Sequence, residues 1–183
     1  TVISRCVLVP FHPLKKETCL NVALQEGIDE EDAFLLTRVV SKTKDYMSIV
    51  VSNAYQNAKT MLKQYIGVKG NPRLLLVDYD VRYKVQAKDT DGNAKDENID
   101  LVKMFLMLLG QFYKDTFVEL KDVPDWYAYA LQKEKERSTN IQRVKLLEIT
   151  QKELNLCNRT NDLNLLLDQA IYEMEEIKYG RSH

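Results

Sequence analysis

The sequence is poor in the residues from which most active sites and metal centres are built. Its 183 residues contain two histidines, three cysteines, six glycines and four prolines. No nucleophile motif and no group of metal ligands stands at the spacing that catalysis or zinc binding needs. Few glycines and prolines also leave little room for tight turns, which favours few, long elements. We therefore expect no enzyme, no cofactor and no small-molecule substrate.

The chain also lacks an excess of charge of one sign. Lysine and arginine contribute 26 residues, aspartate and glutamate 27, and the formal net charge is -1. A protein held mainly to phosphates carries an electropositive surface, which this balance does not provide. Nucleic acid is therefore not expected as the main partner.

Two further absences concern the compartment. No apolar run approaches the roughly 20 residues that cross a membrane, and the N-terminus does not resemble a signal peptide. Cys6, Cys19 and Cys157 are odd in number and irregularly spaced, which indicates free thiols in a reducing compartment. We expect a soluble protein without a membrane partner, located in the cytoplasm or within a particle assembled inside the cell.

Helical periodicity is the main feature that is present. From Asp29 to Ile66 there is no Gly or Pro, and small or apolar residues recur at alternating steps of three and four. Such a stripe predicts a long helix, for which Asp29 offers an N-cap and which a break near 41–44 can divide. Residues 18–70 are thus expected to form a long helical segment. The stripe consists of Val40, Met47, Val51, Ala54, Ala58, Met61 and Tyr65.

Two segments carry patterns typical of β-structure. Residues 1–17 begin with a run rich in β-branched residues that stops at Pro10, and they predict a strand or an extended arm. From Val77 to Lys88 apolar and polar residues alternate, which is typical of a strand with one buried face. Together with a polar loop, this strand is expected to fill residues 73–98.

Further helices are expected near 99–113, 126–137, 141–157 and 163–179, as a bundle over 99–179. The first of them is apolar on nearly all sides and should lie in the middle of the fold. The sequence thus predicts a single domain, 1–183, of the α+β class and predominantly α-helical. In it, long helices pack as a bundle with a small antiparallel sheet or β-hairpin.

The polar loop resembles an EF-hand calcium loop in part. Oxygen-bearing side chains stand at its first, third, fifth and twelfth positions, but Ala94 replaces the glycine of the sixth position. The twelfth residue is an aspartate rather than the usual glutamate. The alternative is a solvated loop in which Asn98 caps the following helix. The candidate metal ligands are Asp89, Asp91, Asn93 and Asp100.

Two smaller groups invite a chemical interpretation. Cys6, His12 and Cys19 can suggest a zinc site or a Cys-His nucleophilic pair, but they lack the close pairing of zinc ligands, and buried thiols explain them as well. Asp78 and Asp80 would lie on one face of the predicted strand, where they could hold a metal. The alternative for this pair is a solvated, charged sheet edge.

The aromatic residues and the N-terminal arm are candidate contact surfaces. Trp and Tyr are enriched in the buried centres of protein interfaces, although their helical spacing also suits packing in the core. The candidate interface residues are Val2, Ile3, Val7, Trp126 and Tyr127.

These observations favour a non-enzymatic structural or assembly subunit that binds other protein subunits in a homo- or hetero-oligomer. Long helices with an inserted β segment and an extended arm are also a layout of ring-forming connector subunits in tailed-phage virions, which is an analogy of layout alone. One alternative is a small regulatory or adaptor protein that responds to calcium. Another is an enzyme whose site is assembled from scattered polar residues.

Overall fold

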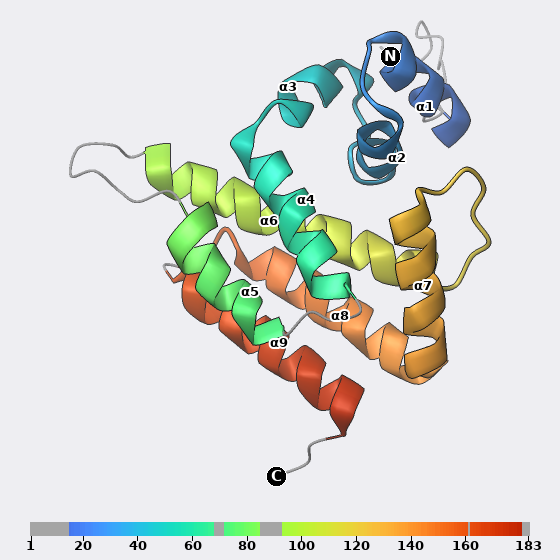
Figure 1. Cartoon of the computed structure of the whole chain (residues 1–183). Coiled ribbons are helices and arrows are strands. Elements are labelled where there is room, and N and C mark those ends of the chain that lie inside the picture. The colour runs from blue at the N-terminus through green and yellow to red at the C-terminus, as the bar shows by residue number, and fades with distance from the viewer. Residues whose placement is uncertain (1–14, 68–71, 85–92, 161, 181–183) are drawn as a thin grey trace, which may run out of the picture.

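The computed structural model describes residues 15–67, 72–84, 93–160 and 162–180, and every regular element within these ranges is helical (Figure 1). A 3-10 turn, η2, precedes α3, and a π-helical segment, η3, continues α5. The elements are α1 (Lys16–Gln25), α2 (Glu30–Val39), η2 (Thr43–Asp45), α3 (Tyr46–Val50), α4 (Asn53–Ile66), α5 (Pro72–Asp78), η3 (Tyr79–Tyr83), α6 (Asn93–Asp115), α7 (Asp125–Arg137), α8 (Asn140–Leu156) and α9 (Leu163–Tyr179).

The prediction of an α+β fold is wrong for the part of the chain that the structure describes. The segment expected to hold the clearest strand is instead helical from Pro72 to Tyr83, and the helix expected from residue 99 already begins at Asn93. Asn98 is therefore a buried residue inside α6 and does not cap it. Residues 1–14, which make up most of the predicted arm, lie outside the described residues, and Lys16 opens α1.

The alternating pattern of residues 77–83 fits a helix as well as a strand. Its apolar positions form two pairs spaced by four residues, 77 with 81 and 79 with 83. In a helix, residues four apart share a face. Tyr79 is buried and Tyr83 packs against the core, whereas Val77 and Val81 are 59% and 73% exposed. The apolar residues thus lie on two opposite faces of one helix rather than on one face of a strand.

The long helix expected from residue 29 to residue 66 is divided. The chain is extended at Val40 and Lys42, which agrees with the expected break, and again at Ser52, whose hydroxyl accepts the Tyr55 N–H as the N-cap of α4. β-Branched residues before each break lower helix propensity. As a result the predicted stripe is buried only in α4, while Met47 and Val51 are exposed.

The core is centred on α6, as the sequence predicted. This helix packs against α4 and α8, and also against α2 and α9. Figure 1 shows α4 crossing over α6, with α8 and α9 on the far side and α7 at one end. The buried apolar residues of α6 are Leu101, Val102, Phe105, Leu106, Leu108, Leu109, Phe112 and Tyr113.

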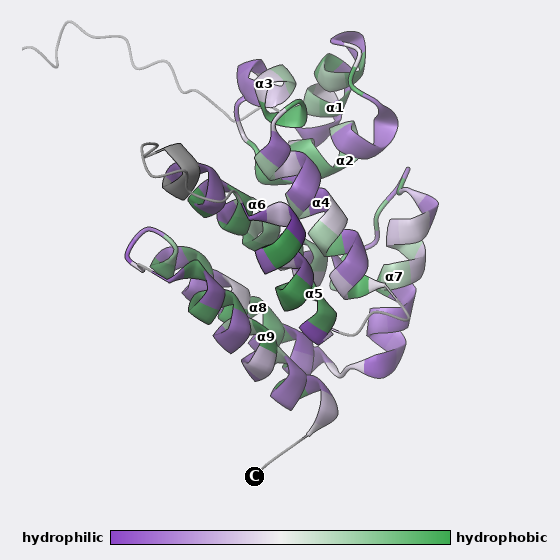
Figure 2. Cartoon of the chain, turned by 60° about the vertical axis from the view of Figure 1, so that its left-hand side comes forward, coloured by the Kyte–Doolittle hydropathy of each residue, from purple (hydrophilic) through white to green (hydrophobic). Residues whose placement is uncertain are grey.

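A second, smaller apolar cluster joins the N-terminal helices. It includes Cys19 and Ala23 of α1, Leu36 of α2, Tyr46 of α3 and Tyr55 of α4. Figures 1 and 2 both place α1, α2 and α3 together at one end of the molecule, above the layer that contains α5, α8 and α9. Helix α4 contributes to both clusters, so it connects the two parts of the core.

The C-terminal helices agree with the sequence to within two residues at each end. Thr139 and Gln142 form a capping box at the start of α8, and Asp162 accepts the Leu165 N–H at the start of α9. Each of these caps satisfies backbone donors that a helix leaves unpaired. At the other end of α9, Gly180 takes the left-handed conformation (φ +61°) that a glycine adopts without strain.

Helix α8 approaches α6 closely at Gly110 of α6, and a larger side chain at this position should therefore destabilise the fold. A Cβ atom built at Gly110 would lie 3.0 Å from Oγ1 of Thr150, which is fully buried. We expect Gly110→Leu to lower the free energy of unfolding by about 1–3 kcal/mol, because the longer side chain overpacks the interface between the helices. Urea denaturation followed by circular dichroism measures the change. An unchanged midpoint would show that α6 and α8 do not meet at this position.

Candidate functional site

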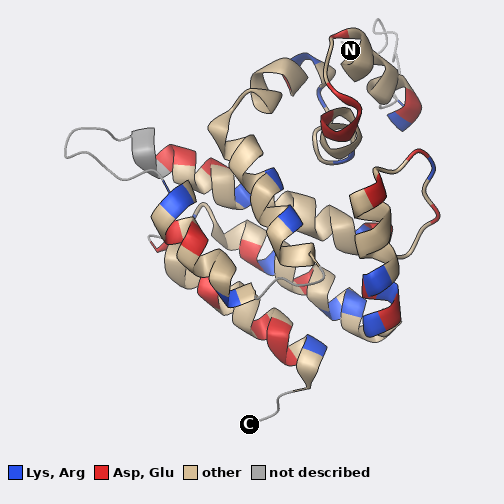
Figure 3. Ribbon diagram, viewed as in Figure 1, with Lys and Arg blue, Asp and Glu red and all other residues tan. Residues whose placement is uncertain are grey.

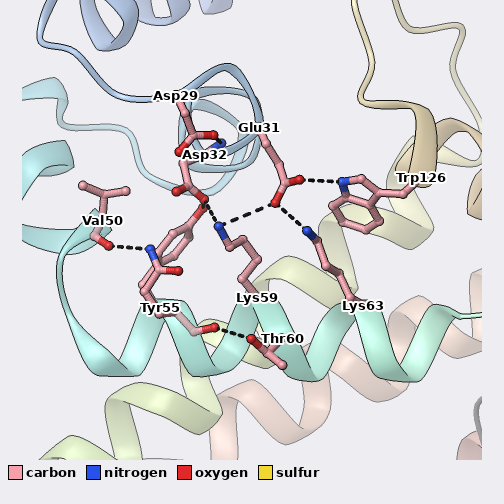
Figure 4. A network of polar contacts seen from close by, with 10 residues as sticks. Asp29, Glu31, Asp32, Val50, Tyr55, Lys59, Thr60, Lys63 and Trp126 are labelled. Carbon is pink, nitrogen blue, oxygen red and sulfur yellow. Dashed lines mark hydrogen bonds and ion pairs between the residues drawn. The ribbon is translucent and has the colours of Figure 1, made fainter.

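A polar network connects the beginning of α2 to α4. Asp29 caps α2 by accepting the Asp32 N–H, which places the Asp32 side chain over α4. Asp32, at 3% exposed, accepts hydrogen bonds from the Tyr55 hydroxyl (2.7 Å) and from Nζ of Lys59 (2.6 Å). Figure 4 shows both donors reaching from α4 toward the carboxylate. This arrangement gives a buried charge the partners that it requires.

The network extends to α7 through Glu31. Its carboxylate lies 2.7 Å from Nζ of Lys63 and 3.5 Å from Nζ of Lys59, and it accepts the indole N–H of Trp126 at 2.9 Å. The Lys63 ammonium also lies over the Trp126 ring, 4.7 Å from its centroid (Figure 4). Three helices that are distant in sequence are therefore joined around two carboxylates.

The electrostatics of this network hold four of its members, Glu31, Asp32, Tyr55 and Lys59, in their usual charge states. Burial disfavours the charged form of Asp32, but hydrogen bonds from Lys59 and Tyr55 outweigh it and lower the pKa of Asp32. The pKa of Glu31 is lowered in the same way by Lys63. Burial also opposes the charge on Lys59, yet Asp32 raises its pKa, and burial and Asp32 together raise the pKa of Tyr55. Each of these four pKa values is therefore shifted away from neutral pH.

This network predicts a loss of stability in acid. A carboxylate whose pKa is lowered by folding stabilises the fold above its unfolded pKa, and the stabilisation is lost as the pH falls through the folded value. We expect the free energy of unfolding to fall below about pH 4, where unfolded carboxyls begin to take up protons. The fall should be smaller in Asp32→Asn, measured by denaturant titration between pH 7 and the acid range. Asp100→Asn, at an exposed position, is the control, and equal acid slopes in all three proteins would contradict the prediction.

A second network centres on Asp115, at the C-terminal end of α6. Its carboxylate accepts hydrogen bonds from the Arg38 guanidinium (Nε, 2.9 Å), the Tyr127 hydroxyl (2.9 Å) and Nε2 of Gln111 (2.6 Å). Asp115 itself is 1% exposed. The Arg38 guanidinium also lies over the ring of Phe34. The partners come from α2, α6 and α7, so this carboxylate is fully engaged within the chain.

A third group of buried polar residues lies between α4, α6, α7 and α9. Nζ of Lys178 is 3.1 Å from Oε2 of Glu134 and lies over the rings of Tyr65 and Tyr113, 5.1 and 5.6 Å from their centroids. Burial opposes the charge of Lys178, but Tyr65 and Glu134 outweigh it and raise its pKa. This lysine stays protonated and paired, which does not suit it as a base or a nucleophile.

A group of large, exposed apolar side chains lies along α5, η3 and α9, which are neighbours in the fold. Helices α5 and α9 pack against each other and run antiparallel. Arg73, near the start of α5, contacts Glu175 near the end of α9, and Asp80 of η3 contacts Asn164 near the start of α9. The residues of this surface are large, exposed and spaced by three, four or seven along their helices. We call it the outer face, and it consists of Leu74, Val77 and Val81 from α5 and η3, and Leu165, Tyr172 and Tyr179 from α9.

Two grooves cross other parts of the described surface. One, of about 610 Å³, lies between the α3–α4 junction and α6, with Ile49, Met104 and Met107 among its lining residues. The other, of about 870 Å³, lies between α8 and α9 and is lined partly by Lys145 and Glu173. In the groove between α8 and α9, the hydrogen bond with Glu173 raises the pKa of Lys152. Burial disfavours the charged form of Glu173, but the bond from Lys152 outweighs it and lowers the pKa of Glu173.

Two of the four candidate calcium ligands lie within the described residues, and both belong to α6. Asp89 and Asp91 lie outside the described residues, Asn93 opens α6, and Asp100 is exposed on that helix. An EF-hand loop needs an irregular backbone through most of its twelve positions, whereas the chain is helical from the fifth onward. Among the described residues there is no group of three or more His, Cys, Asp or Glu that could hold a metal ion.

Of the smaller candidate groups, only Cys19 and the pair Asp78 and Asp80 lie within the described residues. Cys6 and His12 lie outside the described residues, and Cys19 and Cys157 are buried free thiols. Burial raises the pKa of Cys157 to about 11, which keeps it protonated. The proposed carboxylate pair of α5 and η3 is divided between two neighbours. Asp78 accepts a hydrogen bond from Gln64 of α4, and Asp80 accepts one from Asn164 of α9.

The interface candidates fall into different environments. Val2, Ile3 and Val7 lie outside the described residues. Tyr127 is 1% exposed and makes edge-to-face contacts with Phe34 and Phe112, while Trp126 is half-buried and bonded to α2. Both aromatic side chains therefore pack against other residues of the same chain. Sequence reasoning missed the outer face, although the spacing of Leu74, Val77 and Val81 would have revealed it in a helical interpretation.

No family model matches the chain, and comparisons with curated proteins and with solved structures find no match either. The functional argument therefore depends on the sequence and the contacts described above. Within the described residues, no helix combines the length and the apolar character that crossing a bilayer requires.

Proposed function

We propose that this chain is a non-enzymatic assembly subunit that binds another protein chain through its outer face. The outer face carries the proposal, because a surface helix of a monomer normally turns polar residues to the solvent. Scattered exposed apolar residues are ordinary in any protein. Here six of them align along two neighbouring helices, which is the pattern expected of a contact surface.

The three polar networks support the same proposal. In each of them the charged groups pair with one another and connect helices that are distant in the sequence. Such pairing serves to fix the arrangement of helices, because it directs the charged groups toward one another. The enzyme alternative therefore gains no support from these networks, and the calcium-responsive alternative loses the loop geometry on which it depended.

The helical structure of the predicted β segment weakens the analogy with connector subunits. The analogy depended on long helices, an inserted β segment and an extended arm. The β segment is helical from Val77 to Tyr83, and the arm lies mostly outside the described residues. We therefore propose an assembly role without assigning it to a ring or to a virion.

The test is the native mass of the particle that contains this chain in its cell of origin. A tagged chain, recovered without denaturant and measured by light scattering, is expected to belong to a particle well above its own 21.3 kDa. Val77→Glu should reduce that mass, because it places a charge on the outer face. Val51→Glu, at an exposed valine that is not part of the outer face, is the matched control. A particle of 21.3 kDa for the unmodified chain would overturn the proposal.

A further inference from the structure

The apolar stripe of α5 and η3 is nearly symmetric about its central residue. Leu74 stands three positions before Val77, and Val81 stands four positions after it. If two copies of this segment lie antiparallel, Val77 meets its counterpart, and Leu74 of each copy meets Val81 of the other. A surface that fits its own copy in this way forms an isologous contact with twofold symmetry. Figure 2 shows the hydrophobic character of α5 next to α9.

Two charges beside the stripe, Arg73 and Asp80, follow nearly the same symmetry, and Asp80 also pairs with Lys84 at 3.2 Å. Arg73 and Asp80 are seven residues apart, which places them on the same side of the helix. Their contacts agree with this, because both reach toward α9, to Glu175 and Asn164 respectively. Their side chains remain 65% and 54% exposed. Figure 3 shows that charges of both signs are interspersed along this part of the molecule.

An antiparallel pair would bring these charges together twice. Rotation about a twofold axis near Val77 reverses the direction of the helix but leaves the flank that carries Arg73 and Asp80 on the same side of the pair. Arg73 of each copy therefore lies opposite Asp80 of the other. Charge complementarity of this kind sets orientation and register in paired helices. The contacts that both residues make within the chain can persist, since a carboxylate accepts several hydrogen bonds and a guanidinium donates up to five.

We propose that the outer face binds a second copy of this chain, with the two α5–η3 segments antiparallel about a twofold axis at Val77. The inference rests on the proposed function and names the partner at the same surface. Leu165 and Tyr172 of α9 lie beside the stripe and extend the contact. A different protein on this face is the competing outcome, and the experiments below separate the two.

The first experiment is a cross-link in the purified full chain. Val77→Cys, made in a Cys6→Ser background, places a thiol on the twofold axis, where it meets its own copy. Mild oxidation is expected to give a covalent dimer that a reductant releases, because the remaining Cys19 and Cys157 are buried. Val51→Cys in the same background is the control, because Val51 is a valine outside the outer face that is at least as exposed as Val77. Cross-linking of both variants to the same extent would contradict the proposed axis.

The second experiment exchanges the charges. Arg73→Glu or Asp80→Arg alone places like charges opposite each other twice, so we expect dimerisation to weaken about tenfold or more in each. An equimolar mixture of the two variants should recover wild-type affinity, because each chain then supplies what the other lacks. The double variant Arg73→Glu/Asp80→Arg should recover it as well. Sedimentation equilibrium measures the affinities, and thermal unfolding of each variant checks that the monomer fold is retained.

The outcomes distinguish this inference from the proposed function. A purified chain that stays monomeric, or a mixture that fails to recover affinity, overturns pairing between copies. If the native particle is nevertheless large and is reduced by Val77→Glu, the outer face binds a different protein, and the assembly role stands. If the native particle is also a monomer, both proposals fall.

Discussion

Replacing Asp115 with alanine is expected to lower the free energy of unfolding by about 3–5 kcal/mol, which is the usual cost of breaking a buried ion pair. The substitution leaves the Arg38 guanidinium largely buried without its carboxylate, and it removes the acceptor of the Tyr127 hydroxyl. Both groups then lose the hydrogen bonds that offset their removal from water. A loss of this size approaches the total stability of a small domain.

The measurement is chemical denaturation followed by tryptophan fluorescence, which reports on the region because Trp126 adjoins Tyr127. Asp100→Ala, at an exposed position of the same helix, is the matched control and should change the midpoint little. A double variant, Arg38→Met/Asp115→Ala, should be less destabilised than the sum of its single variants, because it removes the unpaired cation. Similar midpoints for Asp115→Ala and Asp100→Ala would show that the buried pair is not formed.

The second large effect is expected at Lys178. Lys178→Met keeps much of the side-chain volume but leaves Glu134 buried without its cation, and we expect a loss of about 2–4 kcal/mol. Oε1 of Glu134 already accepts no hydrogen bond from the described residues, so the carboxylate depends on the lysine at its other oxygen. The attraction of the ammonium to the rings of Tyr65 and Tyr113 is lost as well.

A double-mutant cycle tests this interpretation. Glu134→Leu/Lys178→Met replaces the pair with apolar groups, and it should recover most of the stability that Lys178→Met loses. The exposed pair Lys133–Glu136 on α7 is the matched control, since its removal should change stability little. A double variant no more stable than Lys178→Met would mean that the lysine acts through packing and not through its charge.

Much of the helical part of the fold could be predicted because the signals are local. A cap depends on residues three or four apart, which explains why Asp29 was identified as a helix start. The central position of α6 followed from its apolar composition on all sides. The caps at Ser52 and Lys15 were missed, the first because the surrounding apolar stripe continues across the break, and the second because lysine is not a typical capping residue.

The polar networks could not have been predicted from one sequence. Arg38 and Asp115 are 77 positions apart, and Glu134 and Lys178 are 44 apart. Charged residues are frequent on any surface, so nothing in the local sequence marks these as buried partners. Their pairing follows from how α2, α6, α7 and α9 pack, which depends on many side chains at once.

The sequence by itself determined where the three C-terminal helices begin and end, to within one residue, and which helix lies at the centre, because capping and apolar periodicity act over a few residues. Tertiary structure alone decided the state of residues 72–83. Their alternating pattern fits a strand with one buried face, but it also fits a helix with two apolar faces. Packing against α4 and α9 selects the helix, since it buries Leu75 and Tyr79 and leaves Leu74, Val77 and Val81 exposed on the outer face.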